Sequence, residues 1–163
     1  MQQARKSDVM LYAIGAVCAG FGLYIVLAGL GALPPPGEAH APLWLLAVTG
    51  LTFLLAGVNV LIRAVTRTPD SQGALAAAAP GWLRALYRFT GFGIIVALGT
   101  IGSWVAFGSG PREFTGTLPL GGQIGAYAGR AAFGFGALAI WIVVAGMAIS
   151  FMKRTWRDLK ARR

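Results

Sequence analysis

Four long runs of the sequence contain no Asp, Glu, Lys or Arg, and this feature restricts the fold more than any other. Each run holds about 20 apolar residues, enough for a helix to cross the roughly 30 Å hydrocarbon core of a bilayer. Strands of a membrane barrel are excluded, because they are only about 10 residues long and alternate in polarity, whereas these runs are longer and apolar on every face. The sequence therefore predicts four transmembrane helices, at residues 9–33, 43–62, 89–107 and 131–152.

The overall composition agrees with a membrane protein. Hydrophobic residues make up 56% of the chain and charged residues 12%, whereas about 25% charged residues is usual in soluble domains. The first apolar run is too long for the core of a signal peptide, which has about 7 to 15 residues, so we expect it to be retained. We predict one all-α membrane domain over residues 1–163, a four-transmembrane-helix bundle.

The basic residues are distributed unevenly around these runs. Of the 14 Lys and Arg residues, all but Arg112 and Arg130 precede the first run, lie between the second and third, or follow the fourth. Four spans place those three segments on one side of the membrane, and the positive-inside rule makes that side cytoplasmic. We predict a multi-pass bacterial inner membrane protein with both termini in the cytoplasm. Topology then accounts for the net charge of +9, and no nucleic-acid partner is expected.

Aromatic and basic residues alternate at the predicted cytoplasmic border. Trp82 precedes Arg84 and Arg88 just before the third run, and Trp156 lies among basic residues after the fourth. This pattern is typical of amphipathic helices at the headgroup layer, with rings at the interface and cations near lipid phosphates. We expect short interfacial helices before the third span and at the C-terminus, with anionic lipid headgroups as partners.

The longest predicted external segment, residues 108–122, ends close to the fourth run. Glu113 could pair with Arg130 and hold this segment against the helix ends. Alternatively, Arg112 or Arg130 could bind a lipid headgroup, a carboxylate of a partner protein or an anionic ligand. The sequence leaves these alternatives open.

Small residues recur four apart in the apolar runs, and such spacing allows close packing of helices in lipid. These positions fit internal packing of the four helices, or a face offered to another membrane subunit or a second copy. A similarity between Gly20-Phe21-Gly22 and Gly91-Phe92-Gly93 also allows an internal duplication, although the abundance of glycine, 24 residues in the chain, favours chance matching. The predicted packing glycines are Gly15, Gly99, Gly102, Gly125, Gly129 and Gly136.

Groups able to do chemistry are scarce. His40 and Cys18 are the only histidine and cysteine, so one chain cannot supply a bis-histidine haem or the ligands of a zinc site. The apolar runs contain no ionisable group to mark an ion path. Asn59 is the most polar residue within them, and we expect it to bond to a neighbouring helix. No cofactor, metal site or catalytic residue is predicted.

These observations favour a non-catalytic accessory or assembly subunit that packs against a larger membrane complex. A second hypothesis is a small transporter or channel that is functional only as a homo-oligomer. A third is a lipid-modifying enzyme that uses Arg and Glu near the outer interface. It ranks last because no nucleophile is paired with a base.

Overall fold

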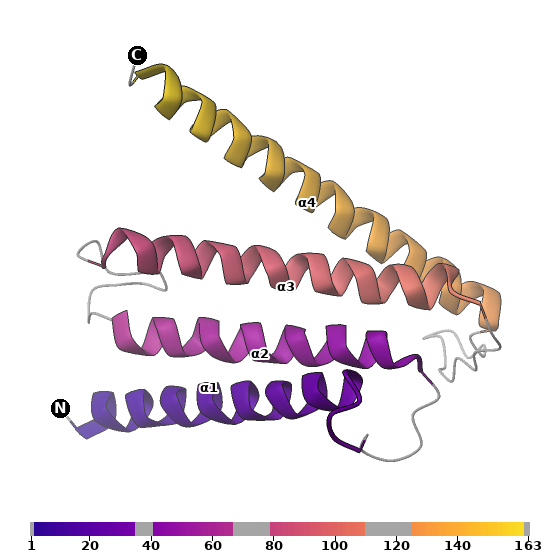
Figure 1. Cartoon of the computed structure of the whole chain (residues 1–163), viewed down its shortest axis with the longest axis horizontal. Coiled ribbons are helices and arrows are strands. Elements are labelled where there is room, and N and C mark those ends of the chain that lie inside the picture. Colours follow the sequence, from indigo (N-terminus) through magenta and orange to yellow (C-terminus); the bar gives the residue numbers. More distant parts are fainter. Residues whose placement is uncertain (1, 35–40, 67–78, 110–124, 162–163) are drawn as a thin grey trace. The chain divides into compact units, whose positions relative to one another are not determined.

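The computed structural model describes residues 2–34, 41–66, 79–109 and 125–161, and every regular element within these segments is a helix (Figure 1). Each helix contains a stretch that is long and apolar enough to cross a membrane. The prediction of an all-helical fold with four candidate spans is therefore confirmed for the part of the chain that the structure describes. The helices are α1 (Gln2–Gly29), α2 (Leu43–Thr66), α3 (Gly81–Phe107) and α4 (Ala126–Ala161).

Helix α1 ends about one turn earlier than the apolar run predicted, at Gly29. Gly31 adopts a φ of 76°, a conformation that costs glycine little because it has no Cβ. Gly31 N donates to Ala28 O at 3.0 Å, and Ala32 N donates to Leu27 O at 2.8 Å. This is the Schellman arrangement of a helix C-terminus. A glycine cap, rather than the end of the apolar run, therefore ends α1.

The segments expected to form short interfacial helices are helical and continuous with α3 and α4. Helix α3 begins at Gly81, where Pro80 O accepts hydrogen bonds from Leu83 N at 3.0 Å and Arg84 N at 3.2 Å. Helix α4 continues without a break to Ala161. No proline lies inside either helix, so nothing in the backbone chemistry forces an interruption. Both segments are therefore helical, as expected, and their location in a headgroup layer stays a prediction.

The contacts of the chain divide it into two compact units, Met1–Ala97 and Leu98–Arg163, with the boundary inside α3. The first unit contains α1, α2 and the N-terminal part of α3, and the second contains the remainder of α3 and α4. Within the first unit, α1 and α2 are antiparallel and lie side by side (Figure 1). The single membrane domain over residues 1–163 stays a prediction.

Most of the buried apolar residues that the structure describes are alanines, and many large apolar side chains are exposed. Ala28 is fully buried and Ala137 is 2% exposed, whereas Phe135 is 75% exposed. None of the described residues has a large side chain that is completely buried. In water-soluble proteins, large apolar side chains such as Phe and Ile are among those most often buried. The interior of this protein is therefore built by close approach of helices.

Candidate functional site

Helices α1 and α2 approach each other backbone to backbone. A Cβ atom placed on Gly22 would lie 2.8 Å from Gly50 O and would overlap Leu54 N. A Cβ on Gly50 would lie 2.8 Å from the carbonyl carbon of Ile25 and 2.9 Å from Gly22 O. Real Cβ atoms essentially never come within 3.0 Å of such atoms. Neither glycine can therefore be replaced without separating the two backbones.

The same contact recurs one heptad away in each direction. A Cβ on Gly57 would lie 2.7 Å from Gly15 O and 2.8 Å from Ala19 Cα, and one on Gly29 would lie 2.7 Å from Ala47 Cα. A seven-residue repeat keeps one side of a helix on its partner when two helices coil around each other with a left-handed twist. The repeat consists of Gly15, Gly22 and Gly29 on α1, and Gly50, Gly57 and Ala64 on α2.

Asn59 makes the polar contact from α2 to α3 inside the first unit. Its Nδ2 donates to Thr90 Oγ1 at 2.8 Å and to Tyr87 O at 3.2 Å. Thr90 is 3% exposed, and its hydroxyl donates to Tyr87 O at 3.0 Å. The expectation that Asn59 bonds to a neighbouring helix is confirmed. This pair of bonds fixes the register of α2 against the start of α3.

In the second unit, the atoms of α4 nearest to Gly99 and Gly102 of α3 are side-chain atoms, and no backbone atom of α4 comes closer than 3.6 Å to a Cβ placed on either glycine. A Cβ on Gly99 would lie 3.1 Å from Ile140 Cγ2, and one on Gly102 would lie 3.5 Å from Ala137 Cβ. The second distance is an ordinary van der Waals contact, and the first requires only a small displacement of a side-chain methyl group. These positions therefore tolerate a methyl group far better than those between α1 and α2.

A hydrogen bond between side chains also joins α3 to α4. Trp141 Nε1 donates to Ser103 Oγ at 2.9 Å, and Ser103 Oγ in turn donates to Gly99 O at 2.7 Å. The Trp141 indole lies beside Gly99, where its Cε2 would be 3.4 Å from an added Cβ, and the residue is 41% exposed. The ring therefore covers the helix contact from one side. An apolar helix can carry this tryptophan because its only donor has a partner.

The side of α4 opposite this contact carries a second repeat of small residues. Ala137 and Val144 are buried, whereas Ala139 and Gly146, two residues further along, are exposed. Two residues correspond to a rotation of about 200° around a helix, so the two pairs lie on opposite sides. Most of α4 is exposed, and among its exposed positions six follow one another in alternating steps of four and three residues along this side. We call them the α4 outer seam; five are small residues and one is valine: Ala132, Gly136, Ala139, Val143, Gly146 and Ser150.

The predicted packing glycines have different surroundings. Gly15 contacts the Leu61 side chain of α2, and Gly99 and Gly102 contact α4 as described above. Gly129 is buried in the first turns of α4. A Cβ on Gly125 or Gly136 would have no heavy atom within 4 Å.

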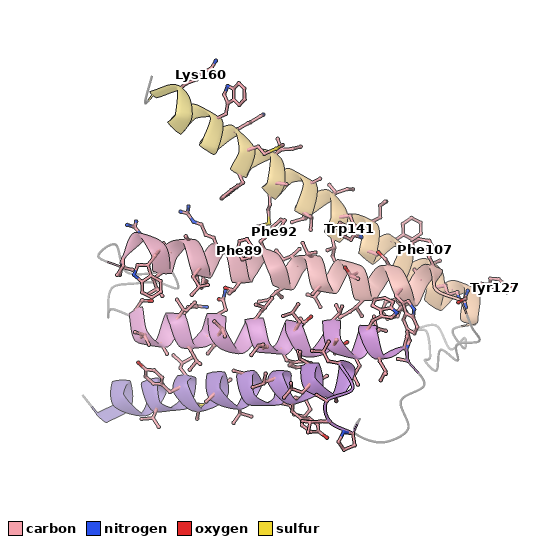
Figure 2. All side chains as sticks on the ribbon, viewed as in Figure 1. Phe89, Phe92, Phe107, Tyr127, Trp141 and Lys160 are labelled. Atoms are coloured by element: carbon pink, nitrogen blue, oxygen red, sulfur yellow. The ribbon has the colours of Figure 1, made fainter. Side chains whose placement is uncertain are left out.

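Aromatic and basic side chains predicted to contact lipid are exposed. On α3, Trp82 is 68% exposed, and Arg84 and Arg88 are also exposed. Trp156 on α4 is 65% exposed and precedes Lys160, which Figure 2 places near the end of that helix. Helical structure thus presents these groups to the surroundings, as a lipid contact requires.

The predicted external ion pair falls mainly outside the described residues. Arg112 and Glu113 are not among them. Arg130 is half-buried in the second turn of α4. Its pairing with Glu113 stays a prediction.

The surfaces described above suit contact with helices and with lipid, and we next consider metal ligands and known proteins. Cys18 carries a free thiol and is half-buried in α1, and His40 lies outside the described residues. No three His, Cys, Asp or Glu side chains within the described segments are grouped to hold a metal ion. Comparison with known protein families, curated proteins and solved structures finds no match for this chain. The proposals below therefore rest on the chain's own geometry.

The four-residue spacing used in the sequence analysis missed most of the α1–α2 contact. Gly22, Gly29, Gly50 and Gly57 all meet backbone atoms of the facing helix, yet only Gly15 of this repeat was singled out. A search for small residues seven apart finds the whole set in the sequence. The period of seven identifies helices that stay in contact over several turns.

Proposed function

We propose that this chain is a non-catalytic subunit of a larger membrane assembly, inserted into a bacterial inner membrane through α1, α2, α3 and α4. Many of its large apolar side chains are exposed, and most of its buried apolar residues are alanines. This suits lipid surroundings, where close packing rather than burial of apolar surface joins helices. The clustering of basic residues supports a cytoplasmic location for both termini.

The α4 outer seam carries the proposal of a subunit role. A Cβ on Gly136 or Gly146 would have no heavy atom within 4 Å, so a neighbouring backbone has room to approach there. The seam has the same seven-residue period that α1 and α2 use for their own contact. Bulky side chains are common on lipid-facing helix surfaces, whereas small residues favour a helix partner. The occupant that fits is a transmembrane helix of another subunit.

Photo-crosslinking from single cysteines tests this surface in native membranes. In a Cys18→Ala background, a thiol-linked benzophenone is attached at Ala139→Cys on the seam or, as a matched control, at Leu138→Cys. Leu138 is 60% exposed and points about 100° away from the seam. We expect one discrete protein adduct from position 139 and only lipid adducts from position 138.

A second variant links the contact to assembly. Ala139→Leu fills the seam, so the captured subunit should no longer co-purify and its complex should accumulate to a lower level, whereas Leu138→Ala should change neither. Adducts from position 139 that contain only a second copy of this chain would favour the homo-oligomeric transporter instead. Adducts confined to another helix of the same molecule would overturn the proposal.

Orientation is tested separately with reporters. Green fluorescent protein fused to the C-terminus should fluoresce, and alkaline phosphatase fused there should be inactive. A reversed pair of signals would overturn the cytoplasmic location of the termini.

A further inference from the structure

We propose that the last turns of α4 form a binding stripe for anionic phospholipid, placed in the headgroup layer of the membrane. The stripe consists of positions Lys153, Trp156, Arg157 and Lys160. It is separate from the α4 outer seam and does not depend on a partner subunit.

The position of the stripe follows from the charge pattern of α4. Between Arg130 and Lys153 the helix carries no charged residue, a distance of roughly 33 Å at 1.5 Å per residue. This length matches a hydrocarbon core of roughly 30 Å crossed with a slight tilt. Lys153 therefore lies where the hydrocarbon ends.

The helix then continues to Ala161 without interruption. Residues 153–160 cover about 10 Å along its axis, somewhat more than the roughly 5–8 Å of headgroup layer on one side of a bilayer. A segment that broke at the interface would lie flat on the surface. The unbroken helix instead carries its basic residues through the layer that holds the lipid phosphates.

The four positions of the stripe lie on one side of the helix. Their spacing of three, four and seven residues places them along one face. Lys153 and Lys160 are exposed, and Trp156 is 65% exposed. An exposed tryptophan at this depth suits the membrane interface, since its ring is apolar and its N–H is polar.

The charge balance identifies the ligand as anionic. From residue 153 to the end of the chain there are six basic residues and one acidic residue, Asp158. Each Lys or Arg near an anionic membrane raises the association constant on the order of fivefold. Removing three of them should therefore weaken lipid binding on the order of 100-fold.

Competition between two lipids tests the stripe on the full-length protein. Protein purified with equal amounts of phosphatidylglycerol and phosphatidylcholine is analysed by native mass spectrometry for the ratio of the two bound lipids. We expect the natural chain to retain phosphatidylglycerol preferentially, and Lys153→Gln/Arg157→Gln/Lys160→Gln to lose this preference. The matched control Arg5→Gln/Lys6→Gln/Arg63→Gln removes the same amount of charge elsewhere in the chain. This variant should retain most of the preference for phosphatidylglycerol.

Two further comparisons separate charge from other effects. Lys153→Arg/Lys160→Arg keeps the charge and should keep the preference, and high salt should remove the preference of the natural chain. Equal loss in the stripe triple variant and the control triple variant would overturn the proposal in favour of a general effect of net charge. Loss in the charge-conserving variant, or no preference in the natural chain, would also overturn it.

Discussion

Two helix contacts can be compared: α1 with α2, and α3 with α4. Both pairs are antiparallel and both have glycines at the interface, but the kind of atom that faces the glycines differs. Gly22 and Gly50 lie against backbone of the facing helix, whereas Gly99 and Gly102 lie against side chains. Backbone atoms move only if a whole helix moves. A side-chain methyl group can shift by a few tenths of an ångström. The same residue type is therefore indispensable in one contact and replaceable in the other.

The largest effect is expected for Gly22→Ala. The added methyl group overlaps Leu54 N and lies 2.8 Å from Gly50 O, and overpacking of this kind costs about 1–3 kcal/mol. Gly20→Ala is the matched control, because a Cβ on Gly20 has no heavy atom within 4 Å. It should be neutral or should stabilise by about 0.5–1 kcal/mol through helix propensity. Unfolding in mixed micelles with SDS measures both, and equal stability of the two variants would refute backbone contact at Gly22.

A smaller effect is expected for Asn59→Ala, which removes the bonds to Thr90 and Tyr87. Interhelical hydrogen bonds in membrane proteins average about 0.6 kcal/mol and reach about 1.7 kcal/mol, so two of them should contribute about 1 kcal/mol. A double-mutant cycle with Thr90→Val isolates the side-chain pair. Thr52→Val is the control, since the Thr52 hydroxyl donates within α2 to Val48 O at 2.9 Å. A coupling energy of zero between residues 59 and 90 would contradict the contact.

The bond from Trp141 to Ser103 should contribute about 0.6 kcal/mol. Trp141→Phe removes the donor and retains much of the ring, and combination with Ser103→Ala should show that the two losses are not additive. Trp82→Phe, at an exposed position of α3, should leave stability unchanged. Strictly additive effects of the two substitutions would show that the bond adds nothing to the α3–α4 contact.

The smallest effect is expected for Gly99→Ala. Crowding against Ile140 Cγ2 at 3.1 Å opposes the gain in helix propensity of about 0.8–1 kcal/mol, so the net change should stay near zero. Gly102→Ala has a contact of 3.5 Å and should be slightly stabilising. Adding Ile140→Leu, which removes the branch at Cβ, should relieve the crowding in Gly99→Ala. Destabilisation by Gly99→Ala as large as that by Gly22→Ala would abolish the distinction between the two contacts.

Several features of the chain could be predicted from local patterns. The charge-free runs gave four helices, and Asn59 was expected to bond to a neighbouring helix because an amide in an apolar run needs a partner. The hydroxyls of Thr49, Thr52 and Thr90 donate to carbonyl groups of their own helices, a bond that any threonine in a helix can make. These outcomes follow from length, polarity and the hydrogen-bonding needs of single residues. The candidate lipid contacts at Trp82 and Trp156 could also be predicted, because they depend only on aromatic and basic residues that are neighbours in the sequence.

Other features depend on a partner helix. Gly20 and Gly22 are nearly adjacent in the same helix, yet one has open space around it and the other touches Leu54. The possible internal duplication has the same difficulty. Gly22 lies against the helix that follows α1, whereas a Cβ placed on Gly93 would lie 2.9 Å from Leu55 Cδ1 in the helix that precedes α3. Sequence similarity between the two segments carries no information about which neighbour each one meets.

The sequence by itself determined that the chain forms four apolar helices with basic residues near one set of ends. Each of these features depends on a single segment: an apolar run must satisfy its backbone hydrogen bonds within itself, and charged residues stay outside it. The tertiary structure decided which glycines are indispensable, since that depends on whether backbone, a side chain or open space lies opposite each one. It also decided that α1 ends at Gly29, before the apolar run does, because a helix end is set by capping groups and contacts rather than by the limit of an apolar run.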